Sequence, residues 1–428
     1  MSRSEMNPAE LEELGCELEA LAVFRALLDD PVVGGLARYL GGTEDAGGHV
    51  ADYVEAVRAL YASGKPTLAA YVRDAVLQDE NCYLVRRGAG QPICPSLEES
   101  VGRELGVLEE LADLSSADVL CAADEGSAAR MPGFEAGEAH LHEVYQERIA
   151  TIGSRGYGIY AQYRTFDVDR DGRICPVRYP DPQRLSDLVG YERERGIILD
   201  NTKALVAGLP ASNILLTGDA GTGKSSTVKA VANELSEQGL RILEVRKEQL
   251  HDIPQILDEL TANPLKFIIF IDDLSFSHED DDFAALKAIL EGSVSAKSGN
   301  VVIYATSNRR HLVRERFSDR DGDDIHRNDT MQEIISLSDR FGIHVSFSKP
   351  SKDAYLQIVH NLAERAQLDM GEAELDLAAE RFATRRGGRS ARGARQLVDQ
   401  LVSAGRGPQG AAGAKAAGNA TNAARSDS

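Results

Sequence analysis

The sequence of 428 residues contains no tryptophan, and its aromatic residues amount to only 6%. A protein built around aromatic stacking platforms is therefore not expected. Basic residues are also in deficit, because 47 lysines and arginines stand against 68 acidic residues and leave a net charge of −21. Affinity for nucleic acid depends first on neutralising phosphates, so this balance disfavours a protein that binds polyanions over its whole surface.

The sequence also has few cysteines and no long apolar segment. The five cysteines are odd in number, widely spaced and never form C-x-x-C, which argues against disulfides or zinc and favours a reducing compartment. Apolar runs such as 267–271 are far shorter than the roughly 20 residues needed to cross a bilayer. The first residues contain no apolar signal-peptide core. We therefore expect a soluble cytoplasmic protein that does not contact membranes.

The acidic charge is concentrated in one part of the chain. Residues 1–150 hold 28 of the acidic and 11 of the basic residues, for a net charge of −17. The remaining residues hold 40 and 36, for a net charge of −4. At roughly 100–200 residues per domain, the length predicts about two to four domains of unlike chemistry.

Helical periodicity dominates residues 10–152. Apolar residues recur there at spacings of three and four, as on one face of an amphipathic helix. We therefore expect an acidic, mainly helical domain over residues 1–152. Within it, Ser96–Glu99 follow Pro95 in the pattern of a capping box, which predicts a helix that runs to about Leu114.

The rest of the chain predicts an α/β fold. Residues 153–184 are rich in glycine, arginine, tyrosine and proline, which indicates a connector with a hairpin. Over 185–348, short apolar runs alternate with amphipathic stretches, which predicts a five-stranded parallel sheet between helices. Residues 349–403 are helical in pattern, and the Gly/Ala-rich stretch 404–428 predicts a disordered tail. The expected strands are 213–217, 241–245, 267–271, 301–305 and 343–347, and the expected helices between them are 225–238, 253–260 and 283–292.

A glycine-rich stretch joins the first of these strands to a helix. Residues Gly218–Ser225 read GDAGTGKS, which fits GxxxxGK[ST] in the strand–loop–helix context that this motif requires. The glycines let successive N–H groups point at a phosphate chain, and the helix adds its N-terminal positive charge. Lys224 is expected to reach the β- and γ-phosphates, and the Ser225 hydroxyl to coordinate Mg²⁺. The predicted nucleotide-binding residues are Gly218, Asp219, Ala220, Gly221, Thr222, Gly223, Lys224, Ser225 and Ser226.

Two carboxylates follow the strand expected at 267–271. Ligand chemistry gathers at the carboxyl ends of parallel strands, where Asp272 and Asp273 would lie. We expect Asp272 to hold Mg²⁺, directly or through water, and Asp273 to polarise the attacking water. The alternative is that both acids cap a loop or a helix.

With these residues in place, the chain resembles the AAA+ ATPases and, more narrowly, a bacterial family catalogued as domain of unknown function 815. The resemblance covers about residues 185–402 and does not rest on the acidic N-terminal region. Its motifs are DLVGY at 187–191, GTGKSS at 221–226, DDLSF at 272–276, ALKAILEG at 285–292, YATSNRRHL at 304–312 and ISLSDRFG at 335–342. The resemblance implies a P-loop AAA+ core over 185–348, a helical lid over 349–403, and ATP with Mg²⁺ as cofactors.

The resemblance also implies roles for three further residues. Asn308 matches the sensor-1 residue, which orients water near the γ-phosphate, and Arg392 matches the sensor-2 arginine of the lid. Arg340 stands where many AAA+ proteins carry an arginine finger, which stabilises charge on a neighbouring subunit's nucleotide. The predicted catalytic residues are therefore Asp273, Asn308, Arg340 and Arg392, and the predicted metal ligands are Ser225 and Asp272.

Each of these roles has an alternative. For Asn308 the alternative is a helix cap, and for Arg340 it is an ion pair with Asp339 or another nearby acid. Arg392 is alternatively part of a solvated basic face, with Arg395 one turn away as a rival for the lid role. Three arginines of a charged segment compete with Arg340 as the finger, namely Arg314, Arg316 and Arg320.

One departure from the AAA+ pattern bears on hydrolysis. Most AAA+ enzymes carry glutamate where this chain has Asp273, and the shorter side chain lies further from the γ-phosphate. The favoured function is an oligomeric ATPase that couples hydrolysis to conformational change. The alternatives are a nucleotide-dependent switch or scaffold with little hydrolysis, and a nucleic-acid loader, which the basic clusters at 309–310 and 385–395 keep open. A protein partner is expected to bind the N-terminal domain.

Overall fold

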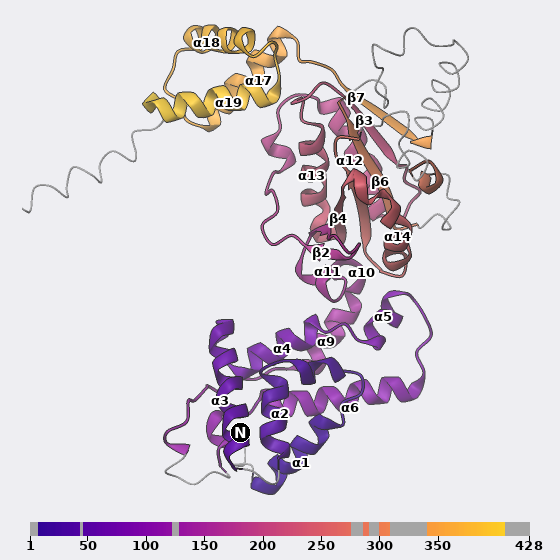
Figure 1. The fold of residues 1–428 in the computed structure, drawn as a ribbon, viewed down its shortest axis with the longest axis vertical. Helices are drawn as coiled ribbons and strands as arrows, with labels where there is room; N and C mark the ends of the chain where they lie inside the picture. Colours follow the sequence, from indigo (N-terminus) through magenta and orange to yellow (C-terminus); the bar gives the residue numbers. More distant parts are fainter. Residues whose placement is uncertain are drawn as a thin grey trace, which may run out of the picture. The chain divides into compact units, whose positions relative to one another are not determined.

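The computed structural model describes residues 7–42, 46–121, 128–274, 286–290, 299–308 and 340–406. They belong to two compact units (Figure 1). The helical unit comprises Met1–Arg164, Glu237–Arg241 and Asp258–Lys266, and the sheet unit comprises Thr165–Ser236, Ile242–Leu257 and Phe267–Ser428. Within the described ranges, no helix is both long and apolar enough to cross a membrane.

The helical unit confirms the helical pattern of residues 10–152. Its core is built from side chains such as Phe24, Tyr53 and Tyr145, which are almost completely buried. Its helices are α1 (Pro8–Glu19), η1 (Arg25–Asp29), α2 (Val33–Gly41), α3 (Ala46–Ser63), α4 (Leu68–Gln78), α5 (Cys82–Gly88), α6 (Pro95–Ala112), α7 (Ser116–Val119), α9 (Leu141–Ala150), α10 (Ile152–Arg155) and α11 (Ile159–Gln162).

Helix α6 begins differently from the sequence-based expectation. Cys94 is its N-cap residue, and no side chain caps the helix there. The capping box predicted at Ser96–Glu99 is therefore wrong, because these residues already lie inside the first turns. Pro95 suits the first helical position, since proline lacks the N–H group that would be left without a partner at that place.

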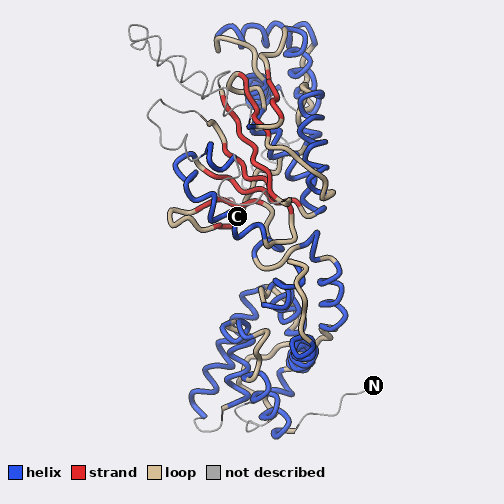
Figure 2. Tube along the Cα trace, turned by 90° about the vertical axis from the view of Figure 1, so that its right-hand side faces the viewer, coloured by secondary structure: helices blue, strands red, loops and turns tan. Residues whose placement is uncertain are grey.

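The sheet unit contains all five predicted strands, each within two residues of its expected bounds. They are β3 (Ile214–Gly218), β4 (Leu240–Val245), β5 (Lys266–Ile271), β6 (Val301–Ser307) and β7 (Ile343–Phe347). Within the described residues the sheet has seven strands rather than five, in the order β2-β1-β4-β5-β6-β3-β7, and they lie side by side in Figure 2. The strand that leads into the phosphate loop is therefore flanked by β6 and β7.

The two additional strands come from the segment that we expected to be a connector, 153–184. Strands β1 (Thr165–Val168) and β2 (Ile174–Pro176) form the predicted hairpin, and β1 also pairs in parallel with β4. Phe166 and Val168 are buried, which explains why the hairpin joins the sheet. The segment therefore divides between the units at Arg164 and Thr165.

Three helices of the sheet unit form a small bundle of their own after β7. These are α17 (Lys352–Arg365), α18 (Glu372–Arg385) and α19 (Ala391–Leu401), and they share a core that includes Tyr355 and Phe382. The other helices with printed bounds among the described residues are η2 (Leu185–Asp187), α12 (Glu192–Val206), α13 (Lys224–Leu235), η3 (Ser236–Gln238), η4 (Lys247–Asp252), α14 (Ile253–Thr261) and η6 (Val402–Arg406). Of the helix predicted at 283–292 only 286–290 are described, and these are helical; the predicted tail lies outside the described residues from 407 onward.

Candidate nucleotide-binding site

The backbone of the loop after β3 requires glycine at three positions. Gly218 has φ +142°, and a Cβ placed there would lie 2.0 Å from the carbonyl oxygen of Phe347 on β7. Gly221 and Gly223 have φ +79° and +96°, in the left-handed region that favours glycine. Gly223 is the N-cap of α13, so the loop ends where the N–H groups of a helix begin.

Lys224 is the first residue of α13 and is buried beneath the loop. Its ammonium donates to the carbonyl oxygens of Gly218 (2.8 Å) and Asp219 (2.9 Å). It also donates to Oδ1 of Asn308 at the end of β6 (2.9 Å). The cation is therefore held inside the curl of the loop by neutral acceptors, which a bound phosphate can replace.

Burial lowers the pKa of Lys224 from its ordinary value. The carboxylates of Asp272, Asp273 and Asp219 oppose this shift, whereas Arg392 adds to it. A buried ammonium favours an anionic partner, because burial penalises the charged form. The electrostatics of the loop are thus suited to a ligand that brings negative charge.

Ser225 and Asp272 meet directly. The Ser225 hydroxyl donates to Oδ1 of Asp272 at 2.6 Å, and the Thr306 hydroxyl donates to the same oxygen at 2.5 Å. Asp272 is exposed at the carboxyl end of β5. A hydroxyl and a carboxylate are the hard oxygen donors that Mg²⁺ prefers, so these side chains fit the predicted metal ligands.

Asp273 has an unusual backbone conformation and is hydrogen-bonded to Thr306 in β6 and to Asn308 just after this strand. Its φ is +55°, which is rare outside glycine, and its N–H donates to the Thr306 hydroxyl at 2.9 Å. Its carboxylate accepts a hydrogen bond from Nδ2 of Asn308 at 2.6 Å. Asn308 therefore bridges Lys224 and Asp273, which places the three predicted residues in one network.

Thr306 is a further residue of the site, which the sequence motifs alone do not indicate. Its hydroxyl contacts both members of the acidic pair, donating to the Asp272 carboxylate and accepting from the Asp273 N–H. The sequence feature that could have identified Thr306 is its position within the stretch 304–312, two residues before Asn308. Nothing in the local sequence shows that this strand lies beside β5, which is what brings Thr306 to both acids.

The start of α19 lies against the phosphate loop. The backbone N–H of Arg392 donates to the carbonyl oxygen of Gly221 at 3.1 Å. Lys349 lies 3.7 Å from the carboxylate of Asp219. Arg392 and Arg395 are both exposed, but the contact described for the loop is made by Arg392. The structure thus places the predicted lid arginine beside the loop.

Arg340 lies away from this cluster. It is half-buried and precedes β7, which begins at Ile343. Strand β7 runs parallel to β3, with Ile343 opposite Ile214 and Phe347 opposite Gly218. Ile343 therefore lies about 13 Å from the level of the loop, at ~3.3 Å per strand residue, and Arg340 precedes it at the opposite end of the strands.

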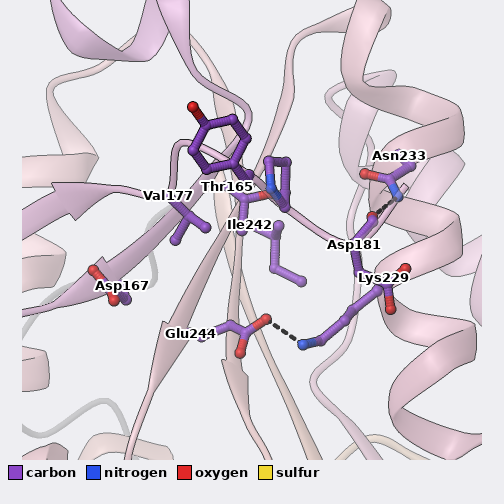
Figure 3. A pocket seen from close by; sticks show the side chains of 10 residues that line it. Thr165, Asp167, Val177, Asp181, Lys229, Asn233, Ile242 and Glu244 are labelled. Atoms are coloured by element: carbon purple, nitrogen blue, oxygen red, sulfur yellow. Dashed lines mark hydrogen bonds and ion pairs between the residues drawn. The ribbon is translucent and has the colours of Figure 1, made fainter. Parts of the chain in front are cut away.

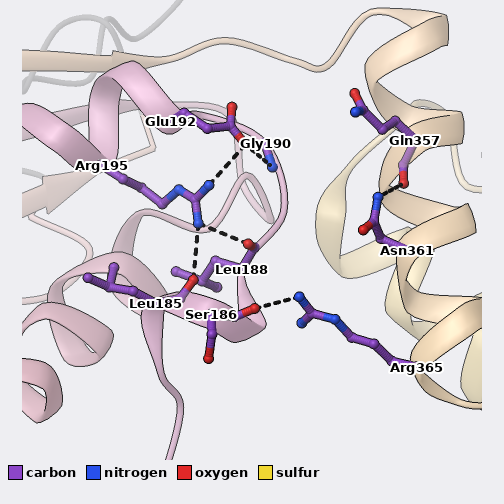
Figure 4. Close-up of polar contacts among 9 residues, drawn as sticks. All are labelled: Leu185, Ser186, Leu188, Gly190, Glu192, Arg195, Gln357, Asn361 and Arg365. Atoms are coloured by element: carbon purple, nitrogen blue, oxygen red, sulfur yellow. Dashed lines mark hydrogen bonds and ion pairs between the residues drawn. The ribbon is translucent and has the colours of Figure 1, made fainter.

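The segment before α12, which contains the DLVGY stretch, is fastened by two arginines (Figure 4). Arg195 donates from Nη1 to the carbonyl oxygens of Leu185 (3.2 Å) and Leu188 (2.9 Å). Arg365 of α17 donates to the carbonyl oxygen of Ser186. At the end of the segment, the Tyr191 hydroxyl donates to the carbonyl oxygen of Ser348 at 2.6 Å, so this segment contacts both α17 and the end of β7.

The other predicted residues of the loop differ in how exposed they are, and some of the alternatives lie outside the described ranges. Asp219 and Ala220 are exposed, Ser226 is half-buried, and Thr222 is buried with its hydroxyl donating to the carbonyl oxygen of Asp219 at 2.9 Å. The alternatives Arg314, Arg316, Arg320 and Asp339 lie outside the described residues.

The strand order and the loop define the class of protein. The core of an AAA+ ATPase has a phosphate-binding loop after a central strand and a helical bundle beside that loop. It also has acidic residues after a second strand, which one further strand separates from the first, as β6 separates β5 from β3 here. The model of the family described as "Protein of unknown function (DUF815)" matches residues 160–405. This match covers more than half of the chain, which therefore belongs to that family.

More distant likenesses cover smaller parts. Replication factor C subunit 3 of Oryza sativa subsp. japonica is 29% identical over 184 residues, which represent 38% of this chain and 49% of that protein. The chain thus spans about half the length of this relative. Among solved structures, a mutant of Thermotoga maritima RuvB aligns with a TM-score of 0.36 and 17% identity, over 52% of this chain and 65% of that one. The Thermotoga maritima RuvB Holliday junction branch migration motor aligns with a TM-score of 0.35 and 17% identity, over 53% and 67%.

Proposed function

We propose that this chain binds ATP with Mg²⁺ and hydrolyses it to ADP and phosphate. The observation that supports this most strongly is the network from Lys224 through Asn308 to Asp273. It gathers a cation, an amide and a carboxylate at the ends of three neighbouring strands, β3, β6 and β5. Phosphoryl transfer requires such positioning and charge stabilisation more than covalent chemistry.

Each residue of the network has a distinct task in this proposal. The loop N–H groups and Lys224 bind the phosphate chain, and the Lys224 ammonium exchanges its carbonyl partners for phosphate oxygens. Ser225 and Asp272 hold Mg²⁺, which neutralises charge on the phosphates when it is bound. Asp273 orients the attacking water and accepts its proton, while Asn308 holds the carboxylate in place.

We infer that hydrolysis is completed between subunits of a homo-oligomer. Arg340 lies at the edge of the sheet opposite to the loop of its own chain. An arginine finger in this position has to act on the nucleotide of a neighbouring copy. Its planar, permanently charged guanidinium suits the charge that develops on the transferred phosphoryl group.

Three substitutions test the proposal. Lys224→Ala is expected to abolish ATP binding, whereas Asp273→Asn retains binding and lowers turnover by about 100-fold or more. Arg340→Ala is expected to lower turnover without weakening binding. Steady-state turnover, nucleotide affinity and oligomer mass with and without ATP are measured together, with Lys203→Ala on the exposed face of α12 as the control.

Two outcomes would overturn parts of the proposal. Unchanged ATP binding in Lys224→Ala would remove the phosphate loop as the nucleotide site. Undiminished turnover by a strict monomer, together with a harmless Arg340→Ala, would remove the role of the neighbouring subunit while leaving ATP hydrolysis intact.

A second candidate function is a nucleotide-dependent switch that hydrolyses little. It is supported by the short side chain of Asp273 and by its hydrogen bond to Asn308, which engages the carboxylate. Rapid turnover that disappears in Asp273→Asn would contradict it.

A third candidate function is a nucleic-acid loader. It is supported by the exposed arginines of the lid, such as Arg385 and Arg395. This function requires salt-dependent binding to DNA or RNA.

A further inference from the structure

A cavity of about 300 Å³ opens between the hairpin side of the sheet and helix α13 (Figure 3). Thr165 of β1 and Ile242 of β4 are paired neighbours and form its buried floor. Lys229 and Asn233 line it from α13, one helical turn apart. Its volume is at the lower end of the range typical of sites for small ligands.

The cavity carries more negative than positive charge. Asp167, Asp181 and Glu244 line it, together with a single cation, Lys229. Lys229 is already engaged, because its ammonium lies 2.6 Å from the Glu244 carboxylate. Within the part of the chain that the structure describes, neither Asp167 nor Asp181 forms an ion pair.

The position of Asp167 makes the excess of negative charge in the cavity unfavourable when no ligand is bound. Asp167 and Glu244 are directly paired on parallel strands, so two carboxylates stand side by side on one face of the sheet. Like charges in such pairs destabilise a sheet. Lys229 compensates Glu244, and Asp167 keeps no partner among the described residues. A second positive charge would therefore be stabilising here.

A hydroxyl group also lies on the floor of the cavity. Thr165 lines this floor and is only 8% exposed. A threonine hydroxyl oxygen can accept a hydrogen bond from a ligand that donates an N–H, which agrees with the sign of the neighbouring charges.

The rim of the cavity is apolar and aromatic. Val177, Tyr179 and Pro180 line this side, and Tyr179 is 94% exposed. An aromatic face beside a site attracts cations, and an apolar wall suits an aliphatic stem. No group of three or more metal-ligating side chains converges anywhere in the described ranges, so these acids are too dispersed to chelate a metal ion.

We propose that this cavity binds an organic cation, with a guanidinium or ammonium head on an aliphatic stem. The head lies between Asp167 and the Thr165 hydroxyl, and the stem lies against Ile242 and the Tyr179 ring. Such a cation is supplied either by an arginine side chain of another polypeptide or by a free polyamine. The site is separate from the phosphate loop and does not depend on ATP hydrolysis.

The absence of tryptophan provides a direct test. In the full-length protein, Tyr179→Trp introduces a single fluorophore at the rim and keeps an aromatic face there. N-acetylarginine amide and spermidine are titrated separately, with N-acetylcitrulline amide as a neutral analogue of similar shape. We expect a saturable change in emission with at least one cation, and affinity about tenfold or more lower for the citrulline compound.

Further variants and a second method complete the test. In the reporter background, Asp167→Asn is expected to weaken cation binding about tenfold, whereas Asp171→Asn, in the exposed turn of the same hairpin, leaves it unchanged. Calorimetric titration of the unmodified protein checks that the tryptophan does not itself block the site. Stronger binding of the arginine compound indicates a polypeptide ligand, and stronger binding of spermidine a free polyamine. The proposal is overturned if neither cation binds by either method, if the citrulline compound binds equally well, or if Asp167→Asn has no effect.

Discussion

At the scale of single residues, Asn308 joins two charged groups that come from different strands. Its amide oxygen accepts from Lys224, and its amide nitrogen donates to Asp273. A side chain with only acceptors, such as aspartate, would place a third carboxylate beside Asp273. The donor and the acceptor of an amide are both used here, which explains why an asparagine stands at this position.

We predict that Asn308→Ala lowers ATP turnover by about 100-fold and changes ATP affinity much less. The loop N–H groups and Lys224 remain to bind phosphate, whereas Asp273 loses the group that orients it. Steady-state turnover and fluorescent-nucleotide binding separate the two effects. Asn361→Ala on α17 is the control, because among the described residues that amide donates to the carbonyl oxygen of Gln357 in its own helix. Equal losses of affinity and turnover would contradict this role.

A buried carboxyl gives the helical unit a pH-dependent stability. Asp79 is only 8% exposed at the end of α4, and burial raises its pKa, against a hydrogen bond from Asn81 that lowers it. A group whose pKa is raised on folding stabilises the fold while it is protonated. That contribution is lost as the pH rises through the folded pKa.

Asp79→Asn is therefore expected to stabilise the helical unit near neutral pH, because the amide is neutral and retains an oxygen that accepts from Asn81. The advantage should shrink as the pH falls towards the ordinary carboxyl value of 3.8. Urea unfolding at about pH 7 and about pH 4 measures the difference. Glu12→Gln, an exposed substitution on α1, is the control, and an advantage that is the same at both pH values would contradict the assignment.

The site residues differ in how far the sequence predicts them. The positions of Lys224 and Ser225 follow from one contiguous motif, and the structure brings both to the loop as expected. The contacts of Asn308 and Thr306 depend on β6 lying between β5 and β3, and local patterns do not contain strand order. Arg340 was predicted from a resemblance alone, and its finger role stays a prediction.

At the scale of elements, one arginine organises the segment that precedes α12. Arg195 is mostly buried and bonds the carbonyl oxygens of Leu185 and Leu188, and it also contacts Glu192 at 3.0 Å. The next contact along, from Arg365 to Ser186, links the same segment to α17. A change in this short segment therefore reaches both the sheet and the helical bundle that follows it.

We predict that Arg195→Met destabilises the sheet unit by about 1–3 kcal/mol, because two carbonyl groups lose their charged donor. ATP affinity should fall as well, since the segment lies beside the lid. Urea unfolding and nucleotide binding measure the two effects. Lys203→Ala, exposed on the same helix, should change neither. Unaltered stability in Arg195→Met would show that the segment is held by other contacts.

The strands were predictable to within two residues because most of their residues are apolar and the segments between them are polar. Strand β5, for example, is buried along Phe267–Ile271. The hairpin was predicted, but its place in the sheet was not. Strands β1 and β2 have only four and three residues, which is too short for periodicity to show that they extend a sheet.

At the scale of the whole molecule, the helical unit is not one continuous stretch of chain. It is completed by Glu237–Arg241 and Asp258–Lys266. Arg241 donates to the carbonyl oxygen of Tyr160 at 2.7 Å, and the Tyr160 hydroxyl donates to Glu259 at 2.7 Å. The buried side chain of Leu265 lies where a Cβ on Gly156 would stand. The composition shift near residue 150 indicated a boundary, but not these later segments.

We predict that a fragment of residues 1–164 is less stable than the same unit in the full chain. Loss of the buried Leu265 side chain alone removes about 1.5–3 kcal/mol of hydrophobic stabilisation. Hydrogen exchange of α9, compared between fragment and full-length protein, measures the loss locally. Equal protection in both would mean that the later segments do not support the unit.

This interrupted arrangement has a consequence for how the protein is made. On the ribosome the acidic helices emerge first, but they lack Arg241 and Leu265 until about one hundred further residues have been synthesised. At about 5–20 residues per second, that interval lasts roughly 5–20 s. During this time the surface around Gly156 and Tyr160 is uncovered in the nascent chain. Chaperones that bind exposed apolar segments can therefore act on this surface during a defined interval, which ends when Lys266 leaves the exit tunnel.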